Sequence, residues 1–577
     1  MKAGMAAALL FVSAQVFVQA QTTSLTYVGM QAIATGTVIG GEEIGGLSGI
    51  SYNPYTEVFT AITDDSRRAG ASRMWNVSLA YDGSGFSAVT VNSSIPIKTE
   101  EGGTQPLTDA EGLAGNLDGS FYISHEGLAA GTDPISIPPW IHRIDPLTGI
   151  KEAEATLPVK FLPRNASGQA VPPDDATQTS GVRSNLSLEC LGLVPSKKML
   201  FTANEAALKQ DYNGTYNSDT NQAQNSEIRT VRFTGVPGNP AAAEEKVYRA
   251  DQGTLFIFVR RFNTVPDILP IDDTGRLLVM ERGLSQNNTN TGSYRIRIYE
   301  VDFNQTTATN VAGIPALTGS SYTRLNKTLV WESSTNMDNV EALCFGRDVN
   351  GFRTVVLASD NNFSASQSTQ FHVFLTNIPA VPRRILSVGA TGSGTLTAQP
   401  SVAWYPDGSE VVLSAVPATY YSFGDWTGDA TGTTNPLALT LDANKSLTAR
   451  FLSPLQTWGT GYFSTDEILE MNWTTSDPDG DGLSNLLEYA FNLNPGQPSL
   501  TGIPFIGEDN ADLTLTYQKD ISKPDISYQV EVSDNLVAWP PAGDVLVLTN
   551  GTIETRQANV PVSGGRRFLR LKITKLF

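Results

Sequence analysis

Cysteine and histidine are scarce in this 577-residue chain, which has two cysteines and three histidines. The histidines, His125, His142 and His372, argue against a histidine-rich zinc centre and leave a Ser-His-Asp triad only through one of them. The cysteines, Cys190 and Cys344, fall in segments that we expect to be inner strands of non-neighbouring repeats. An exported protein could pair them, but strands so placed seldom come within disulfide reach, so we expect two buried thiols.

Positive charge and long apolar runs are also in short supply. The chain has 39 Lys and Arg against 58 Asp and Glu, a net charge of -19, which argues against nucleic acid as a partner. Its extended apolar run, residues 5–18, precedes a small-residue cleavage pattern ending at Ala20. This predicts a signal peptide over residues 1–20 and a secreted or cell-surface protein. No other run is long and apolar enough to cross a bilayer, so we expect no transmembrane segment.

What the sequence does have is an internal repeat of apolar strands bordered by acids. Five times a strand start is followed, one strand later, by an acidic cluster. The pairs are residues 45–47 with Asp64 and Asp65, 111–113 with Glu126, 189–191 with Glu205, 267–269 with Glu281, and 341–343 with Asp360. Four of these strands open on Glu111, Glu189, Asp267 and Glu341, whereas the first has Gly45. There, either Glu42 or Glu43 substitutes, or that sector is open for substrate.

Each repeat has the pattern of four short strands, which predicts an all-β fold. In the second repeat we expect strands at residues 111–115, 120–125, 140–145 and roughly 153–159, rich in β-branched and aromatic residues between turn formers. Radially repeated four-stranded units predict a β-propeller over residues 21–379. We expect five blades, or six if a long insert such as residues 164–187 hides a degenerate unit. The last repeat lacks an outer strand, which residues 25–33 are expected to supply.

Propeller geometry brings the start of strand one and the end of strand two to one rim near the axis. Converging carboxylates need protons or cations, and Ca²⁺ prefers such oxygen ligands. The expected metal ligands are Glu189, Glu205, Glu281, Glu341 and Asp360. The expected catalytic residues are Glu111, Glu126 and Arg282, with Arg67, Arg68 and Arg183 as further candidates for binding a substrate anion. Any single one of these acids could instead be a turn former.

Ordered motifs in this region resemble a known family. They are Gly-Leu-Ser-Gly at 46–49 followed by Asp64-Asp65, Ala-Glu-Gly-Leu at 110–113, Leu-Leu-Val-Met-Glu-Arg at 277–282, and Ser-Asp-Asn-Asn-Phe at 359–363. Together they resemble the phytase-like domain described as having esterase-like activity, over roughly residues 25–378. The resemblance implies phosphate-ester chemistry and a small anionic substrate without fixing a catalytic residue.

The C-terminal third follows a different plan. Residues 385–452 resemble the bacterial repeat domains related to internalin B-repeats, which implies a spacer or adhesive module; we expect its Trp426 to be a core aromatic rather than a ligand-binding one. Residues 503–577 alternate apolar and polar side chains, which predicts a small β-sandwich. These modules suggest attachment to a cell surface.

Between these modules lies a calcium-loop pattern. Asp477, Asp479 and Asp481 occupy positions one, three and five, Leu483 offers a carbonyl at seven, and Glu488 stands at twelve. Because no good helix precedes the loop, the segment 470–495 resembles a dockerin or thrombospondin type 3 repeat more than a full EF-hand. An acidic linker is the alternative.

Two functions are compatible with these features. The first is a secreted, metal-dependent hydrolase of phosphate esters or related esters, with Ca²⁺ at the rim. The second is a non-enzymatic surface protein whose propeller binds a ligand while the C-terminal modules anchor it, and the lack of an unambiguous nucleophile favours it.

Overall fold

The computed structural model describes residues 22–64, 72–98, 109–127, 138–212, 226–251, 260–286, 292–499, 501–510, 512–562 and 566–577. The signal peptide predicted for residues 1–20 lies outside this set, as do Asp65, Arg67 and Arg68. The chain forms two compact units. The first extends to Arg383 and includes Tyr405–Ser409, and the second holds Arg384–Trp404 and Glu410–Phe577. Within the described ranges, no helix has the length and apolar character needed to cross a membrane.

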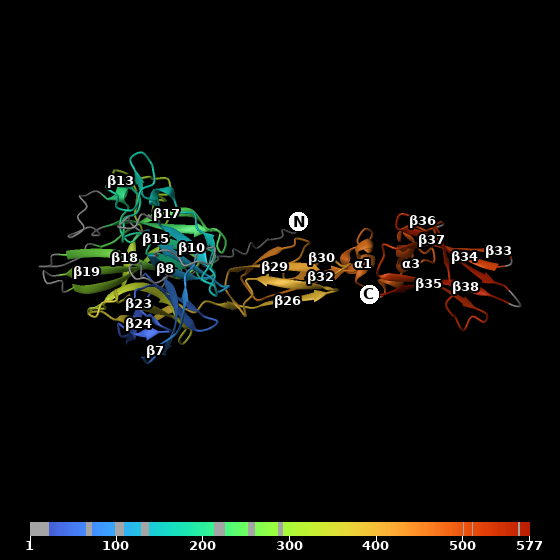
Figure 1. Ribbon diagram of the computed structural model, residues 1–577, viewed down its shortest axis with the longest axis horizontal. Helices are drawn as coiled ribbons and strands as arrows, with labels where there is room; N and C mark the ends of the chain where they lie inside the picture. The colour runs from blue at the N-terminus through green and yellow to red at the C-terminus, as the bar shows by residue number, and fades with distance from the viewer. Residues whose placement is uncertain are drawn as a thin grey trace, which may run out of the picture. The chain divides into compact units, whose positions relative to one another are not determined.

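Five four-stranded antiparallel sheets form most of the described part of the first unit (Figure 1), which also holds two small two-stranded sheets, β2 (Val38–Ile39) with β3 (Glu42–Glu43) and β12 (Arg164–Asn165) with β13 (Gln178–Ser180). The first sheet contains β4 (Leu47–Asn53), β5 (Val58–Thr63), β6 (Arg73–Tyr81) and β7 (Phe86–Pro96). The second contains β8 (Ala110–Gly115), β9 (Phe121–His125), β10 (Trp140–Ile144) and β11 (Lys151–Glu154). The third contains β14 (Cys190–Leu193), β15 (Leu200–Ala203), β16 (Glu227–Thr234) and β17 (Ala241–Arg249).

The last two sheets complete the unit. The fourth contains β18 (Arg260–Pro270), β19 (Arg276–Gln286), β20 (Gly292–Asp302) and β21 (Lys327–Glu332). The fifth contains β22 (Asn339–Phe345), β23 (Phe352–Asp360) and β24 (Thr369–Pro379), and its outer strand is β1 (Leu25–Ile33). β1 pairs antiparallel with β24 from Leu25 opposite Thr376 to Ile33 opposite Thr369. The predicted pairing of this N-terminal segment with the last repeat is therefore confirmed.

The sheets contact one another in cyclic order. The first strand of each sheet contacts that of the next: β4 with β8, β8 with β14, β14 with β18, β18 with β22, and β22 with β4. Each neighbouring pair of sheets also encloses an apolar core. Between the fifth and first sheets, for example, Phe371 shares a buried cluster with Phe59 and Trp75. Burial of such side chains contributes about 1.5–3 kcal/mol each.

The strands of the second repeat lie close to their predicted positions, with one exception. β8, β9 and β10 begin and end within one residue of expectation, whereas the outer strand β11 lies at Lys151–Glu154 rather than near 153–159. The cause is a tight turn in which the carboxylate of Asp145 accepts the N–H groups of Leu147 and Thr148. This turn lets the chain pair again directly after Gly149.

Glycine allows the first strands to approach one another. A Cβ on Gly112 of β8 would lie 2.6 Å from the Cβ of Leu191 and 2.7 Å from the backbone oxygen of Glu189, both in the neighbouring repeat. These distances are well below van der Waals contact, and backbone has little freedom to give way. Gly112 therefore sets the spacing between two segments that carry acids.

We expect Gly112→Ala to lower the free energy of unfolding by about 1–3 kcal/mol, the usual cost of overpacking. The control is Gly85→Ala, where a Cβ would meet nothing within 4 Å, and which should change stability by less than about 0.5 kcal/mol. Urea unfolding of both variants measures the difference. Equal stabilities would show that the spacing of β8 relaxes without cost.

A buried ion-pair network joins the third sheet to residues 303–326, which connect β20 to β21. Arg229 of β16 is fully buried and donates from Nε and Nη2 to Asp211, at 2.6 and 3.1 Å, and from Nη1 to Glu245 at 3.0 Å. Its Nη2 also donates to the carbonyl oxygen of Ile314, and Asp211 accepts the N–H of Leu317. The guanidinium thus neutralises two buried acids and holds the connection in place.

The second unit begins with two three-stranded sheets. One contains β26 (Leu386–Thr391), β32 (Lys445–Leu452) and β30 (Ser422–Gly428), and the other contains β27 (Gly394–Gln399), β29 (Ser409–Pro417) and β31 (Leu437–Leu441). Trp426 is 1% exposed and donates its indole N–H to the carbonyl oxygen of Thr434. It is the core aromatic that the sequence predicts.

The second unit ends in two antiparallel sheets that share one core. They contain β33 (Phe505–Asp509), β34 (Asp512–Asp520), β37 (Ile553–Pro561) and β36 (Val545–Asn550), and β35 (Ile526–Ser533) with β38 (Phe568–Lys575). Leu515, Ala558 and Val530 belong to the shared cluster. Before these sheets come the short helices α1 (Pro454–Gly459), α2 (Thr465–Ile468) and α3 (Asn485–Phe491).

Candidate functional site

Six of the predicted acids lie at the same ends of their strands and are brought together in the first unit. They are Glu111, Glu126, Glu189, Glu205, Glu341 and Asp360, and none is more than 9% exposed. Glu111 lies on β8 and Glu341 on β22, whereas Glu126 and Glu205 follow β9 and β15. Within each of these repeats, one acid therefore comes from the start of the first strand and the other from the end of the second strand, as the repeat predicts. We call this group the acid centre.

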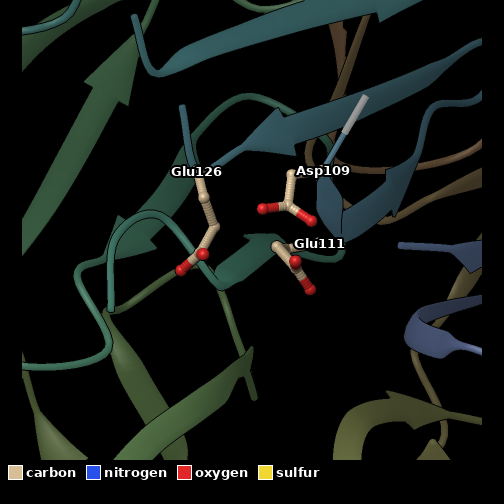
Figure 2. Close-up of side chains that lie close together, drawn as sticks. All are labelled: Asp109, Glu111 and Glu126. Carbon is tan, nitrogen blue, oxygen red and sulfur yellow. The ribbon is translucent and has the colours of Figure 1, made fainter. Parts of the chain in front are cut away.

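Four carboxylates of the acid centre, together with the neighbouring Asp109, form two groups of oxygens that share Glu126. One oxygen from each of Asp109, Glu111 and Glu126 lies within 4.8 Å of the others, and the same holds for Glu126, Glu189 and Glu205. Figure 2 shows the first group, whose three side chains reach into one common space. Three carboxylate oxygens this close suit a hard cation such as Ca²⁺.

Asp109 was not among the predicted ligands. It lies two residues before Glu111, immediately ahead of β8, and side chains two apart in extended chain point to the same side. The same spacing places Asn339 beside Glu341: its side-chain nitrogen donates to Glu341 at 2.8 Å and to Asp360 at 3.3 Å. The residue two positions before each strand-opening acid is therefore the signal that would have identified both.

Burial and mutual repulsion raise the pKa values of the acids. Burial raises the pKa of Glu111 well above its usual range, and the nearby Glu189 and Asp64 raise it further. Burial and then Glu205 do the same to the pKa of Glu189. Burial and Glu341 raise the pKa of Asp360 to about 8. At neutral pH the group therefore keeps its charge only if a cation compensates it.

Hydrogen bonding differs among the acids. Glu126 accepts the backbone N–H of Ser187 at 2.7 Å, and Glu341 accepts the hydroxyl of Ser48 at 3.1 Å. By contrast, within the part of the chain that the structure describes, the carboxylates of Glu111 and Glu189 accept no hydrogen bond. The charges of these two carboxylates are therefore not offset by hydrogen bonds, and a bound cation would stabilise them.

Arg282 places a positive charge among the acids. Its guanidinium donates from Nη2 to Glu205 at 2.8 Å and from Nη1 to Asn339 at 2.9 Å and to Glu341. The nearby Glu341 and Glu205 keep its pKa above the usual value despite burial. Its Nε is buried and has no acceptor within the described ranges. The expected substrate-binding arginine is thus largely engaged by acids, with one donor direction remaining.

Glu281, predicted as a metal ligand, is not brought to the acid centre. It neighbours Arg282 in β19, so the two side chains lie on opposite faces. Its carboxylate accepts the hydroxyl of Tyr248 and the ammonium of Lys327, each at 2.5 Å, and the amide of Asn263 at 2.7 Å. These contacts give Glu281 a structural role between the third and fourth sheets.

Asp267, the strand-opening acid of the fourth repeat, is likewise engaged in structural hydrogen bonds. Its carboxylate accepts the N–H groups of Ile268 at 2.8 Å, Leu343 at 2.7 Å and Leu191 at 3.4 Å. It therefore links the first strands of the third, fourth and fifth sheets through backbone donors.

In the first repeat, neither acid before Gly45 substitutes for the missing carboxylate. Glu42 forms an ion pair with Arg73 at 2.9 Å, and Glu43 accepts the N–H of Gly36 at 3.0 Å. A Cβ on Gly45 would lie 2.5 Å from Oδ1 of Asn361 and 2.8 Å from the ring of Phe363. Glycine stands at this position because these side chains lie directly against it.

The other residues singled out in the sequence are buried and make structural contacts. His125 is fully buried, stacks on Trp140 with 4.7 Å between ring centroids, and accepts the N–H of Gly127 through Nδ1. Arg183 is buried with its guanidinium 5.8 Å from the ring centroid of Tyr212. Cys190 and Cys344 are both free and buried, which confirms the expected thiols.

A cavity of about 860 Å³ opens elsewhere in the first unit, beside β10 and β11. Its lining includes Trp140, His142, Arg164 and one acid, Glu154, but none of the acid centre. His142 stacks on Trp140 with 3.8 Å between ring centroids, and burial lowers its pKa to about 3. With one carboxylate and a neutral histidine, this cavity lacks the converging oxygens of a hard-cation site.

Buried, converging carboxylates at the strand ends of three of the five four-stranded sheets define a protein with an acid-rich centre suited to hard cations. The family described as phytase-like, with the esterase-like activity of phytase, matches residues 42–363. This range is more than half of the chain and holds the whole acid centre, so the chain belongs to that family. A divergent InlB B-repeat domain matches residues 385–453. The comparison with curated proteins gave no match.

Proposed function

We propose that the first unit is a five-bladed β-propeller whose acid centre binds Ca²⁺ and hydrolyses phosphate esters. Two observations support the propeller: the cyclic order of first-strand contacts and the apolar core between each neighbouring pair of sheets. The pairing of β1 with β24 removes the free edge that the fifth sheet would otherwise expose.

The observation that carries the metal proposal is the pair of oxygen groups sharing Glu126. Glu111 and Glu189, which accept no hydrogen bond within the described ranges, lie in different groups. The residues present therefore fit one cation, or two with Glu126 between them. When bound, Ca²⁺ would neutralise the substrate phosphate and polarise the attacking water.

The chain's own residues would supply the general base and the group that binds the substrate phosphate. Glu111 is the proposed general base, acting through an oxygen that the ion would leave free, because burial raises the pKa of its carboxylate. The Ser187 N–H fixes the orientation of Glu126. Arg282, held by Glu205 and Glu341, would direct its remaining donor toward a phosphate oxygen.

Export and surface attachment complete the proposal. The apolar N-terminal run of residues 5–18 supports secretion, and the match of residues 385–453 to a divergent InlB B-repeat domain supports a spacer that presents the propeller. A small molecule with a phosphate group is the proposed substrate, and the net charge of -19 disfavours nucleic acid.

The test is an assay of the full chain after chelation. A phosphate monoester, a phosphodiester and a carboxyl ester are each supplied with and without added Ca²⁺. We expect hydrolysis of a phosphate ester, measured as release of its alcohol, to rise at least about 100-fold on adding Ca²⁺, since a metal supplies several kcal/mol of charge stabilisation. Cleavage of the carboxyl ester alone would reassign the substrate class. Calcium binding without turnover of any ester would favour the non-enzymatic ligand-binding function.

A further inference from the structure

A second group of carboxylates lies in the second unit, in the loop that precedes α3. One oxygen from each of Asp477, Asp479 and Asp481 lies within 4.8 Å of the others. Asp477 accepts the N–H groups of Gly480 at 2.9 Å and Gly482 at 2.8 Å, so the loop curls around its first acid. Both glycines have positive φ, 76° and 91°, which a residue with a side chain rarely adopts.

The observation that points to a ligand is Glu488, in the first turn of α3. Its side chain is fully buried, and neither carboxylate oxygen has a hydrogen-bond partner in the described part of the chain. The charges that act on it are those of Asp479, Asp481 and Asp477. Oδ2 of Asp479 is likewise buried and without a described partner. Leaving such oxygens bare in the interior costs several kcal/mol per group.

These residues supply the oxygens that a calcium ion takes. Three aspartates, the backbone carbonyl of Leu483 and a bidentate Glu488 would give six ligands, within the six to eight that Ca²⁺ prefers. No arginine or lysine is hydrogen-bonded to these acids among the described residues. We propose that residues 477–488 bind one Ca²⁺ ion, and that this ion fastens α3 into the core of the second unit.

The coupling to the core runs through α3. This helix has only seven residues, too few to be stable alone. Its Tyr489, Ala490 and Phe491 lie in a buried cluster with Leu452 of β32 and Ile526 of β35. An ion held by Glu488 would therefore stabilise a cluster that receives side chains from both ends of the second unit.

Hydrogen bonds also connect the loop and α3 to the rest of the second unit. Tyr489 donates its hydroxyl to Asp525 at 2.8 Å, and Asp525 also accepts the N–H of Leu455 at the start of α1. On the far side, Asp481 accepts the N–H of Ser499 at 2.6 Å. Calcium binding would thus order the chain from the loop to residue 499 and tie it to α1 and β35.

Hydrogen exchange of the full chain, read by mass spectrometry with Ca²⁺ or with a chelator, tests this proposal. At a Ca²⁺ concentration 100 times the dissociation constant, mass action stabilises the bound loop by about 2.7 kcal/mol. Amides in residues 477–499 should therefore exchange about 100-fold more slowly with Ca²⁺. Peptides from the acid centre report separately, so failure of this proposal and failure of the hydrolase proposal are distinguishable.

Glu488→Gln should abolish the protection while leaving chelated protein folded, because it removes charge and keeps shape. Asp479→Asn, a second loop variant, should weaken it at least about 10-fold. The matched control is Glu470→Gln, an exposed acid of the same segment, which should keep full protection. Protection that persists unchanged in both loop variants, or no response to Ca²⁺ in the unaltered chain, would overturn the proposal.

Discussion

Glu189→Gln is expected to lower kcat/KM for phosphate esters by at least about 100-fold, the effect of losing several kcal/mol of charge stabilisation. Glutamine fills the same volume but brings no charge to the group shared with Glu126 and Glu205. The site would hold Ca²⁺ less tightly, and more Ca²⁺ should be needed for half-maximal rate. Steady-state kinetics across a Ca²⁺ titration measures both effects.

The same substitution should not destabilise the metal-free protein. Burial and the neighbouring Glu205 and Glu126 raise the pKa of Glu189 and favour its neutral form, so a neutral glutamine loses no favourable charge interaction. We therefore expect Glu189→Gln to unfold in chelator at the same or a higher urea concentration than the unaltered chain. The control is Glu152→Gln on β11, a partly exposed partner of Arg143, which should leave activity unchanged. Full activity in Glu189→Gln would contradict the proposed role of the acid centre.

Arg229→Ala is expected to lower the free energy of unfolding of the first unit by about 3–5 kcal/mol, the cost of breaking a buried ion pair from one side. It leaves Asp211 buried without its guanidinium partner, while Glu245 keeps, among the described residues, only Lys160 at 3.2 Å. Residues 303–326 should also become sensitive to protease, because the arginine holds the carbonyl of Ile314. Urea unfolding and limited proteolysis measure these two effects.

The control for this prediction is Arg249→Ala, at the end of β17 in the same sheet. The side chain of Arg249 is 46% exposed and pairs with Glu227 at 3.8 Å, and a pair of that kind contributes about 0–1 kcal/mol. Similar losses from the two substitutions would mean that the buried network around Arg229 adds nothing beyond a surface pair.

The strand pattern of the first unit could be predicted because each repeat carries local signals. Alternating apolar runs bounded by Gly, Asp and Pro placed β8, β9 and β10 within a residue, and the unpaired last repeat pointed to β1. The outer strand β11 was misplaced because its position depends on the turn at Asp145. The face on which each side chain of a strand lies follows from alternation along the strand. The residue at which this alternation begins is known only once the actual ends of the strand are known.

The same limit explains the acid centre. Glu281 and Arg282 are adjacent, so only one of them can face the centre, and the sequence motif does not say which. In the structure Arg282 faces the acid centre and donates to Glu205, whereas Glu281 accepts hydrogen bonds from Tyr248 and Lys327. Asp109 and Asn339 were missed because the repeat pattern singles out the strand-opening acids themselves. Each of the two reaches the site because it stands two residues before such an acid. Contacts between distant repeats, such as Arg282 with Glu205, require the folded chain.

A diffraction measurement can locate a metal ion in the acid centre. Crystals of the full chain would be grown with Mn²⁺, which takes carboxylate ligands and scatters anomalously. We expect an anomalous peak among Glu126, Glu189 and Glu205, or between Asp109, Glu111 and Glu126, and we expect it to weaken in Glu189→Gln. A map with a peak at residues 477–488 and none in the acid centre would contradict this expectation.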